Sequence, residues 1–361
     1  MSASVLKVGI IGQGRSGRNI HAETLRKLTD RYAIVAVSDE VEQRRQMAAS
    51  DFGCAVYADY REMMNRNDLD LIVNATPSHL HVPVSLELLE AGFNVLCEKP
   101  LARKAEAVDA LIAASRRTGK LLTVFQQWRF NPIFLEIRKC LASGVLGRIV
   151  QISLTVNQFS RRWDWQTLKT YNGGNLLNTG AHFLDQALQF VDSEPSTILC
   201  QMDNANSFGD AEDYCKVILT GENMPLVDLE ISNCCTYPRS DNYLIQGTNG
   251  SLKASLSEVE WRFFRPEEAP QQVVQHAPMS DADGKPLYCR EELKWYEGAW
   301  KRGEGISYPA PQIAFYEALY DTMTNGKQLA VTPESVRLQI RIMEECFRQN
   351  AKFTYEVPGM V

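Results

Sequence analysis

The chain has 361 residues, of which 45% are hydrophobic and 23% are charged, and its formal net charge is −6. This length predicts about two domains, and the composition is that of a folded globular protein. A mildly acidic chain lacks the basic face that binds nucleic acid, and no apolar run is long enough to span a membrane.

The cysteines and the first residues indicate the compartment. The nine cysteines form no Cys-x-x-Cys pair and include the adjacent Cys234 and Cys235, which suits neither a disulfide framework nor a zinc site. The first residues lack the basic start and the small-residue cleavage site of a secretory signal. We therefore expect reduced thiols and a cytoplasmic protein.

Short β-branched runs alternate with helical stretches over the first third of the chain. Strands are expected at residues 8–11, 34–37, 56–57, 71–74, 95–97 and 121–125. Helices are expected at residues 15–28, 42–50, 60–65, 81–90 and 105–117. This alternation predicts right-handed crossovers and a doubly wound, mostly parallel sheet with helices on both faces.

Near residue 127 the pattern changes to strands that few helices separate, which predicts a largely antiparallel sheet. These strands are expected at residues 149–158, 197–203, 214–220, 226–233, 243–246 and 260–264. Helices are expected at residues 131–143, 176–191, 312–324 and 334–349, and a polar, proline-rich loop at 266–286. We therefore expect an α/β domain over residues 1–127 and an α+β domain with a large open sheet over residues 128–361.

A Gly-x-Gly-x-x-Gly motif follows the first expected strand and opens the first expected helix. Its members are Gly12, Gln13, Gly14, Arg15, Ser16 and Gly17. The first glycine permits a tight turn, the second lets the backbone approach a pyrophosphate, and the third lets the helix pack on the strand. The helix N-terminus would then attract the phosphates. The alternative is a glycine-rich turn without a ligand.

Asp39 lies 22 residues after Gly17, at the end of the second expected strand. A carboxylate at this position hydrogen-bonds the ribose hydroxyls of NAD and repels the 2′-phosphate of NADP. Arg44 and Arg45 follow on the next expected helix, so NADP stays open. The alternative for Asp39 is an ordinary helix cap. Strand, glycine motif and acid together predict a dinucleotide site, with NAD as the expected coenzyme.

Two further segments follow expected parallel strands, at the edge where open α/β sheets bind ligands. They contain Ala75, Thr76, Pro77, His79 and His81, and then Glu98, Lys99 and Pro100. A lysine beside a nicotinamide can have its pKa lowered by desolvation and can carry the proton that accompanies hydride transfer. The alternative is a surface lysine before a loop proline.

The histidines differ in what the sequence indicates. His81 begins a helix after a strand end, so it could lie near the nicotinamide or stabilise the loop. His21 and His276 show no partner signal. No pair of the five histidines has an acid or a cysteine at ligand spacing, so we expect no metal site.

These motifs occur in a fixed order with Arg129-Phe130-Asn131-Pro132 and with the segment from Gly173 to His182 that precedes Asp185. In this order they resemble the glucose–fructose oxidoreductase/inositol dehydrogenase/rhizopine catabolism (Gfo/Idh/MocA) family over nearly the whole chain. The resemblance implies a Rossmann domain that holds NAD or NADP, with a coenzyme site that extends to both strand-end segments and to Gln126. It also implies a homodimer or homotetramer formed through the open sheet.

The resemblance further implies catalytic residues. Lys99 matches the lysine that contacts the reacting hydroxyl, and its bond to Pro100 is a candidate for the cis form. His182 matches the general base of the polyol dehydrogenases, and Asn178 stands where many members carry an aspartate. Because an amide holds neither a proton nor a negative charge, proton transfer should depend on Lys99 and His182. The alternative for His182 is a satisfied histidine packed under the sheet.

Three more residues are expected at the substrate: Arg129, Arg162 and Trp163. Aromatic faces bind sugar rings, and arginines bind hydroxyls or carboxylates. The alternative for the 161–165 loop is a core tryptophan beside a solvated charge pair. Trp295 and Trp300 could form a lid or a dimer contact.

We therefore expect an NAD(P)-dependent dehydrogenase or reductase acting on CH–OH groups. It would move a hydride between the nicotinamide and a ring hydroxyl or keto carbon of a sugar, sugar derivative or cyclic polyol. Two alternatives are an NAD-dependent redox glycosidase and a non-catalytic, sugar-responsive regulator. The joint presence of Lys99 and His182 disfavours the regulator, whereas Asn178 slightly favours unusual chemistry.

Overall fold

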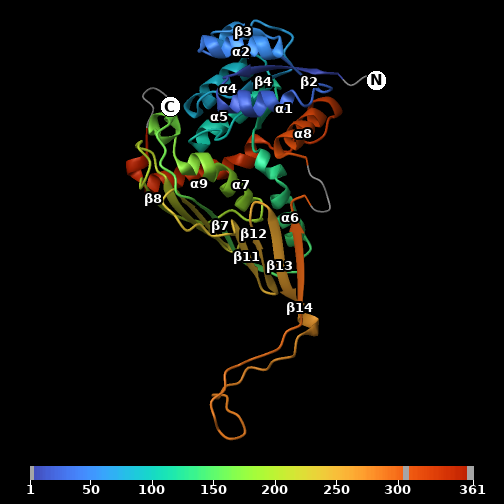
Figure 1. Cartoon of the computed structure of the whole chain (residues 1–361), viewed down its shortest axis with the longest axis vertical. Helices are drawn as coiled ribbons and strands as arrows, with labels where there is room; N and C mark the ends of the chain where they lie inside the picture. Colours follow the sequence, from blue (N-terminus) through green and yellow to red (C-terminus); the bar gives the residue numbers. More distant parts are fainter. Residues whose placement is uncertain (1–3, 304–308, 356–361) are drawn as a thin grey trace.

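The computed structural model describes residues 4–303 and 309–355, and it contains two β-sheets with helices around and between them (Figure 1). The outer ends of the expected domains, residues 1–3 and 356–361, lie outside the described residues. The first sheet belongs to the N-terminal part of the chain, and the second sheet lies beyond the last helices, which return between the two (Figure 1). Among the described residues, no helix is long and apolar enough to cross a membrane.

The first sheet has six parallel strands in the order β3-β2-β1-β4-β5-β6. Its strands are β1 (Leu6–Ile11), β2 (Tyr32–Ser38), β3 (Ala55–Tyr57), β4 (Leu71–Asn74), β5 (Val95–Cys97) and β6 (Leu122–Val124). Every residue of β4, β5 and β6 is buried, because helices cover both faces. This order, with a reversal between β1 and β4, confirms the expected doubly wound sheet.

The helices of this half mostly match the sequence pattern. They are α1 (Glu23–Leu25), α2 (Glu42–Phe52), α3 (Tyr60–Met63), α4 (His81–Glu90) and α5 (Ala105–Thr118). The expected single helix over residues 15–28 is wrong in one respect, because residues Arg15–Ala22 (η1) form π-helical turns before α1. Such widened turns are frequent at functional sites, and these follow the glycine motif directly.

The second sheet has eight strands in the order β14-β13-β12-β11-β7-β10-β9-β8, and only the β7–β10 pair is parallel among those described. The strands are β7 (Ile149–Asn157), β8 (Thr197–Asp203), β9 (Tyr214–Thr220), β10 (Leu226–Ser232), β11 (Tyr243–Gly247), β12 (Gly250–Ala254), β13 (Glu258–Phe264) and β14 (Trp295–Lys301). The sequence pattern missed β12 and β14. Both are short or polar segments that become strands by antiparallel pairing with β13.

Four helices belong to the second half: α6 (Pro132–Ala142), α7 (Ala181–Leu188), α8 (Pro311–Asn325) and α9 (Pro333–Gln349). The segment before α7, Leu176–Gly180 (η6), is π-helical, so the expected helix over residues 176–191 is also split. Short 3₁₀ turns join the larger elements at Ser78–Leu80 (η2), Gln127–Phe130 (η3), Trp165–Thr167 (η4), Lys169–Tyr171 (η5), Pro266–Glu268 (η7) and Ala351–Phe353 (η8).

Helices α6, α7 and α9 contact the second sheet, and strand β9 alternates buried and half-buried residues, as expected of a sheet covered on one face. Trp300 is partly buried and packs against the apolar core.

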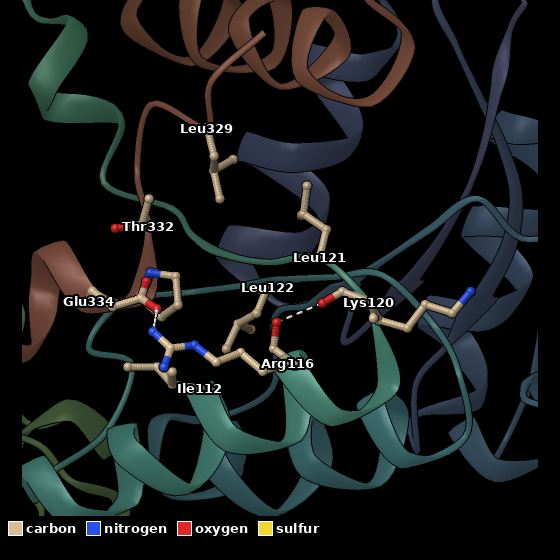
Figure 2. Close-up of a pocket in the computed structure, with 11 residues that line it drawn as sticks. Ile112, Arg116, Lys120, Leu121, Leu122, Leu329, Thr332 and Glu334 are labelled. Atoms are coloured by element: carbon tan, nitrogen blue, oxygen red, sulfur yellow. Dashed lines mark hydrogen bonds and ion pairs between the residues drawn. The ribbon is translucent and has the colours of Figure 1, made fainter. Parts of the chain in front are cut away.

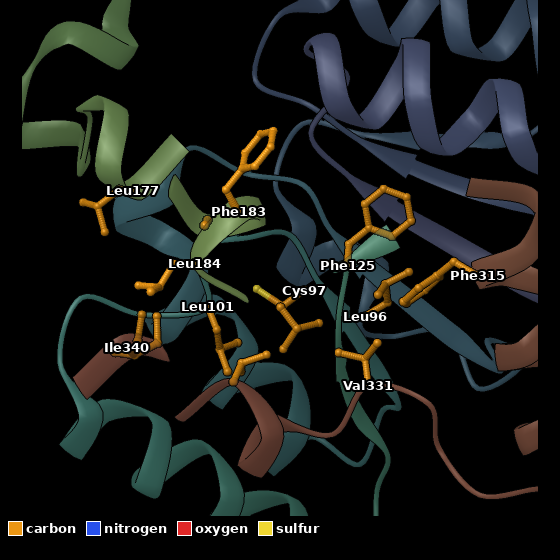
Figure 3. Packing of buried hydrophobic residues seen from close by; sticks show 14 of the residues in the cluster. Leu96, Cys97, Leu101, Phe125, Leu177, Phe183, Leu184, Phe315, Val331 and Ile340 are labelled. Atoms are coloured by element: carbon orange, nitrogen blue, oxygen red, sulfur yellow. The ribbon is translucent and has the colours of Figure 1, made fainter. Parts of the chain in front are cut away.

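One continuous apolar cluster joins the two halves. Figure 3 shows Leu96 of β5 and Phe125 after β6 packed near Phe315 of α8, with Leu184 of α7 and Ile340 of α9 nearby. Helix α9 also contacts α5 and β6. This packing holds α7 against the carboxyl edge of the first sheet, which is the edge where the candidate site lies.

Candidate active site

The glycine motif forms a cradle at the end of β1. Gly12 has a φ of +89°, and a Cβ there would lie 2.5 Å from the carbonyl oxygen of Ala75. A Cβ on Gly17 would overlap the carbonyl group of Gly12, whereas Gly14 has open space around it. The first and third glycines are thus needed for packing, and the second leaves the backbone accessible. This arrangement fits the pyrophosphate of a dinucleotide.

Asp39 ties the second strand to the glycine motif. Its Oδ2 accepts a hydrogen bond from the Gln13 backbone N–H at 2.6 Å, and its Oδ1 accepts one from the Val41 N–H at 2.8 Å. The Arg44 guanidinium lies 3.5 Å from the Asp39 carboxylate, and Arg45 donates to the Asp39 carbonyl at 2.8 Å. The carboxylate suits ribose hydroxyls, and the two arginines beside it suit a 2′-phosphate.

Asn74, at the end of β4, organises the next loop. Its amide donates to the His81 carbonyl at 3.1 Å and to the Ser85 hydroxyl at 3.0 Å, and its Oδ1 accepts from the Thr76 hydroxyl at 2.7 Å. This shapes the backbone of Ala75 and Thr76 beside Gly12.

His81 is buried, and its two ring nitrogens face backbone oxygens. Nδ1 lies 2.7 Å from the Pro100 carbonyl oxygen, and Nε2 lies 3.1 Å from that of Thr76. The His81 ring therefore joins two loops, which fits the second of its two expected roles, the stabilisation of the loop. His79 packs edge-on against Tyr171, with ring centroids 4.9 Å apart.

Lys99 follows β5 and reaches across to the second half of the chain. Its ammonium donates to the Oδ1 of Asn178 at 2.9 Å and to the Asn178 carbonyl at 3.1 Å, and its bond to Pro100 is cis, as expected. Burial lowers the pKa of Lys99, the Glu98 carboxylate opposes this effect, and the charges of Arg15 and Arg162 lower it further. The amine is thus oriented by the Asn178 amide and brought closer to a proton-exchanging pH range.

Sequence reasoning missed the support behind this lysine. Glu98 accepts a hydrogen bond from the Lys99 N–H at 3.1 Å, and its other oxygen lies 3.1 Å from Nε2 of the fully buried His21. Nδ1 of His21 lies 2.7 Å from the Tyr316 hydroxyl of α8. Burial alone would raise the pKa of Glu98, but the hydrogen bond and charge of His21, with the charges of Lys99 and His81, lower it to about 2. Glu98 is therefore a buried carboxylate that contacts both the Lys99 backbone and His21.

His182, in the first turn of α7, stacks on Trp128 with ring centroids 5.3 Å apart and planes inclined by 22°. Its Nδ1 is buried without a hydrogen-bond partner among the described residues. Burial, and then the charge of Lys99, hold the pKa of His182 well below its ordinary value. The imidazole is therefore neutral at neutral pH and able to accept a proton.

Asn178 and His182 were expected on one face of a single α-helix. Asn178 instead lies in the π-helical segment η6, and α7 begins only at Ala181. Both residues still lie beside Lys99. Asn178 accepts hydrogen bonds from the Lys99 ammonium, and the charge of Lys99 lowers the pKa of His182.

Two expected site residues make contacts with α7 and α9. Arg129 forms a two-point ion pair with buried Asp185, at 2.8 and 2.6 Å, and donates to the Ser335 hydroxyl at 2.9 Å. Gln126 is buried, and its amide donates to the Ala181 carbonyl at 3.0 Å and to Gln339 at 3.1 Å. These contacts bind Arg129 and Gln126 to α7 and α9, and the side-chain oxygen of Gln126 stays without a partner among the described residues.

The loop after β7 stands at the rim of the site. The Arg162 guanidinium donates to Asp164 at 2.7 Å, and its charge reaches Lys99. Trp163 is 80% exposed, so the expected core role of this tryptophan is excluded and its indole is free to meet a ligand. Among residues 4–303 and 309–355, no group of histidine, cysteine, aspartate or glutamate residues could hold a metal ion.

A second surface cleft, of about 340 Å³, lies between α5 and the start of α9 (Figure 2). Several of its polar groups are paired with one another: Arg116 forms an ion pair with Glu334 at 2.9 Å, and the Ser115 hydroxyl donates to the Lys120 carbonyl at 2.6 Å. It lies at the amino end of β6, opposite the strand ends that carry Lys99. It therefore has no chemical connection with the glycine motif.

Comparisons with known proteins agree with this geometry. A family described as an oxidoreductase family with an NAD-binding Rossmann fold matches residues 6–126, and the GFO/IDH/MocA C-terminal domain matches residues 134–253. The chain is 26% identical over 346 residues to the scyllo-inositol 2-dehydrogenase (NADP(+)) IolW of Bacillus subtilis, which covers 94% of this chain and 92% of the relative.

Solved structures share the fold. An NAD-binding protein from Listeria innocua matches with a TM-score of 0.78 and 23% identity over 96% of this chain and 98% of the other. The WlbA dehydrogenase of Bordetella pertussis, in complex with NADH and UDP-GlcNAcA, matches with a TM-score of 0.75 and 19% identity, covering 96% and 98%. With the glycine cradle, Asp39 and the buried lysine in place, the chain belongs to the Gfo/Idh/MocA family of NAD-binding oxidoreductases and is a dehydrogenase that acts on CH–OH groups.

Proposed function

We propose that the protein moves a hydride between a nicotinamide coenzyme and a ring carbon that bears a hydroxyl or keto group in a sugar, sugar derivative or cyclic polyol. The observation that supports this most is the pairing of Lys99 with Asn178 beside neutral His182, next to the glycine cradle. A regulator would gain nothing from a buried lysine whose pKa is lowered next to a neutral imidazole.

The chain's own residues would then do the following. The bound dinucleotide supplies the hydride chemistry. Lys99 contacts the oxygen of the reacting hydroxyl, and His182 or Lys99 takes its proton during oxidation and returns it during reduction. Asn178 holds the lysine amine in place through its amide oxygen, which explains why an amide serves at this position. Arg162 and exposed Trp163 would contact the rest of the sugar from the rim.

The choice of coenzyme depends on a small region beside β2. Asp39 supports NAD, whereas Arg44 and Arg45 offer positive charge for NADP. We propose NAD as the preferred coenzyme, because the buried negative charge of the Asp39 carboxylate would repel the 2′-phosphate of NADP.

The test incubates the purified protein with sugars, sugar acids, cyclic polyols and glycosides, in parallel with NAD and with NADP. Reduced coenzyme is measured by its absorbance, and the products are analysed by chromatography. Stoichiometric reduced coenzyme with one substrate, lost in the Lys99→Ala variant, would support the proposal. Release of an aglycone without net reduced coenzyme would replace it by the glycosidase alternative. Coenzyme binding without turnover on any compound class would contradict it.

Other expectations stay proposals. We propose a division near residue 127, between the last strand of the first sheet and η3, and self-association through the face of the second sheet that α6, α7 and α9 leave uncovered. We also propose the cytoplasm as the compartment, because all nine cysteines are free thiols.

A further inference from the structure

Residues 265–294, which join β13 to β14, form an arm that extends away from the rest of the chain (Figure 1). All residues from 270 to 290 except Asp281 are exposed. The arm carries large apolar side chains, with Val273, Val274 and Tyr288 exposed by 76%, 79% and 88%. Exposed apolar side chains gathered on one segment commonly mark a contact surface.

The root of the arm is built firmly onto the sheet. Glu268 accepts a hydrogen bond from the Tyr296 hydroxyl at 2.7 Å and forms ion pairs with Lys294 at 2.9 Å and with Arg265 at 3.2 Å. On the other side of the same strand pair, the Arg262 guanidinium lies 4.6 Å from the centre of the Trp295 ring. The sheet therefore holds the arm in a defined direction.

Beyond the root, the arm interacts with itself. The Leu287 N–H donates to the Met279 carbonyl at 2.9 Å, and the Asp281 N–H donates to the Lys285 carbonyl at 2.9 Å. Within the described parts of the chain, the hydrogen bonds of residues 270–291 all stay inside the arm. An isolated two-stranded hairpin is marginally stable in water, because ordering its backbone costs about 1–2 kcal/mol per residue without burial in return. A partner that buries the apolar side chains would supply the missing stabilisation.

The chemistry of the arm limits what that partner can be. Residues 270–291 contain three acidic and two basic side chains, so the arm has no basic face for nucleic acid or anionic lipid. Prolines at 270, 278 and 286 prevent it from adding as a regular strand to a sheet edge. The partner must therefore offer an apolar protein surface that receives side chains.

We propose that the arm of each copy packs against a second copy of this chain, so that two copies clasp each other reciprocally. The arm joins the two outermost strands at one edge of the second sheet, and Trp295 at its root is exposed on that edge, so exposed apolar side chains are present on both the arm and the sheet edge. The 22 residues from 270 to 291 match the roughly 20–30 residues that one side of a standard interface contributes. In a two-fold symmetric dimer each arm contacts the other copy in the same way, and no further copies can add through the same surface.

The test measures self-association of the full chain by sedimentation velocity over a range of concentrations. Val274→Asp combined with Tyr288→Asp changes only exposed side chains, so folding should be unaffected. We expect the wild type to dimerise and this double variant to raise the dimer dissociation constant about tenfold or more. Tyr237→Asp is the matched control, because Tyr237 is 92% exposed but lies outside the arm. A monomeric wild type, or an unchanged dissociation constant in the double variant, would overturn the proposal.

A second measurement locates the contact. Cys289 lies exposed on the arm and can carry a photo-crosslinker in a Cys234→Ser background, since Cys234 is the other exposed thiol among the described residues. The protein is prepared as an equal mixture of ordinary and nitrogen-15-labelled chains. Crosslinked peptide pairs that combine both isotopes would place the arm on the second copy. Pairs that always carry one isotope would show that the arm folds back on its own chain.

Discussion

Glu212 is a buried carboxyl group whose replacement should stabilise the protein. It lies beneath the glycine pair before η6, where a Cβ on Gly174 would collide with it. Its Oε1 accepts a hydrogen bond from the Leu176 N–H at 2.7 Å, whereas its Oε2 is buried without a partner among the described residues. Burial raises the pKa of Glu212 from 4.5 to about 8, although the Leu176 N–H and the charge of Arg103 oppose the change.

The sign and size of the effect follow from this pKa. Above pH 4.5 the unfolded chain releases the Glu212 proton, but the folded protein retains it until about pH 8, so stability falls as the pH rises between these values. At pH 7 the loss is about 3 kcal/mol, at about 1.4 kcal/mol for each pH unit. Glu212→Gln keeps the acceptor for Leu176 and removes the titration. We therefore expect the variant to match the wild type near pH 4.5 and to be more stable by about 3 kcal/mol at pH 7.

The measurement is urea unfolding followed by tryptophan fluorescence at pH 5 and at pH 8, for the wild type and the variant. Glu222→Gln is the control, because it removes the same charge from an exposed residue. If Glu212→Gln were no more stable than the wild type at pH 8, the carboxyl group would be ionised in the folded protein and paired with Arg103. The reasoning from burial would then be refuted.

Three more predictions concern the candidate site. Lys99→Ala should lower kcat by about 10²–10⁴-fold with unchanged coenzyme affinity in a fluorescence titration, and intact turnover would rule out Lys99 as the acid–base residue. Gly12→Ala should destabilise the protein by about 1–3 kcal/mol and weaken coenzyme binding. The reason is that Gly12 has a φ of +89° and that the new Cβ would lie 2.5 Å from the Ala75 carbonyl oxygen. A thermal unfolding curve of the variant identical to that of the wild type would contradict this. Glu98→Gln should lower the free energy of unfolding by about 3 kcal/mol above pH 4.5, because the ionised Glu98 stabilises the folded wild type there. The wild type loses this stabilisation as the pH falls towards 2, so the stabilities of the two proteins should converge in acid denaturation. A constant difference in stability would contradict the pKa of about 2.

The sequence alone predicted much of the first half, and the reasons are local. Parallel strands such as β4 and β5 are short apolar runs between helices, and they appear where the pattern places them. The glycine motif can be identified from spacing because Gly12 has a positive φ of +89° in the turn, and Gly17 leaves no room for a Cβ beside the Gly12 carbonyl group. The family followed from the order of such motifs, and the comparisons confirm it.

The second sheet was less predictable, because pairing overrides local preference there. β14 contains Glu297, Gly298 and Lys301, and its residues become a strand only against β13. The π-helical turns at Arg15–Ala22 and Leu176–Gly180 were likewise expected as parts of ordinary helices. Local composition does not distinguish them from α-helix, because the difference lies in how the turns pack.

Only the tertiary structure decided which polar side chains meet. His21 and Glu98 are 77 residues apart in sequence, and His21 and Tyr316 are 295 apart, so no spacing pattern could connect them. The same holds for Arg129, which the sequence favoured as a substrate contact and which the fold pairs with Asp185. The sequence determined which chemical groups stand at the strand ends, because strand and turn propensities act over a few residues. The fold determined their charge states and partners, because burial and long-range contacts set the pKa of each group.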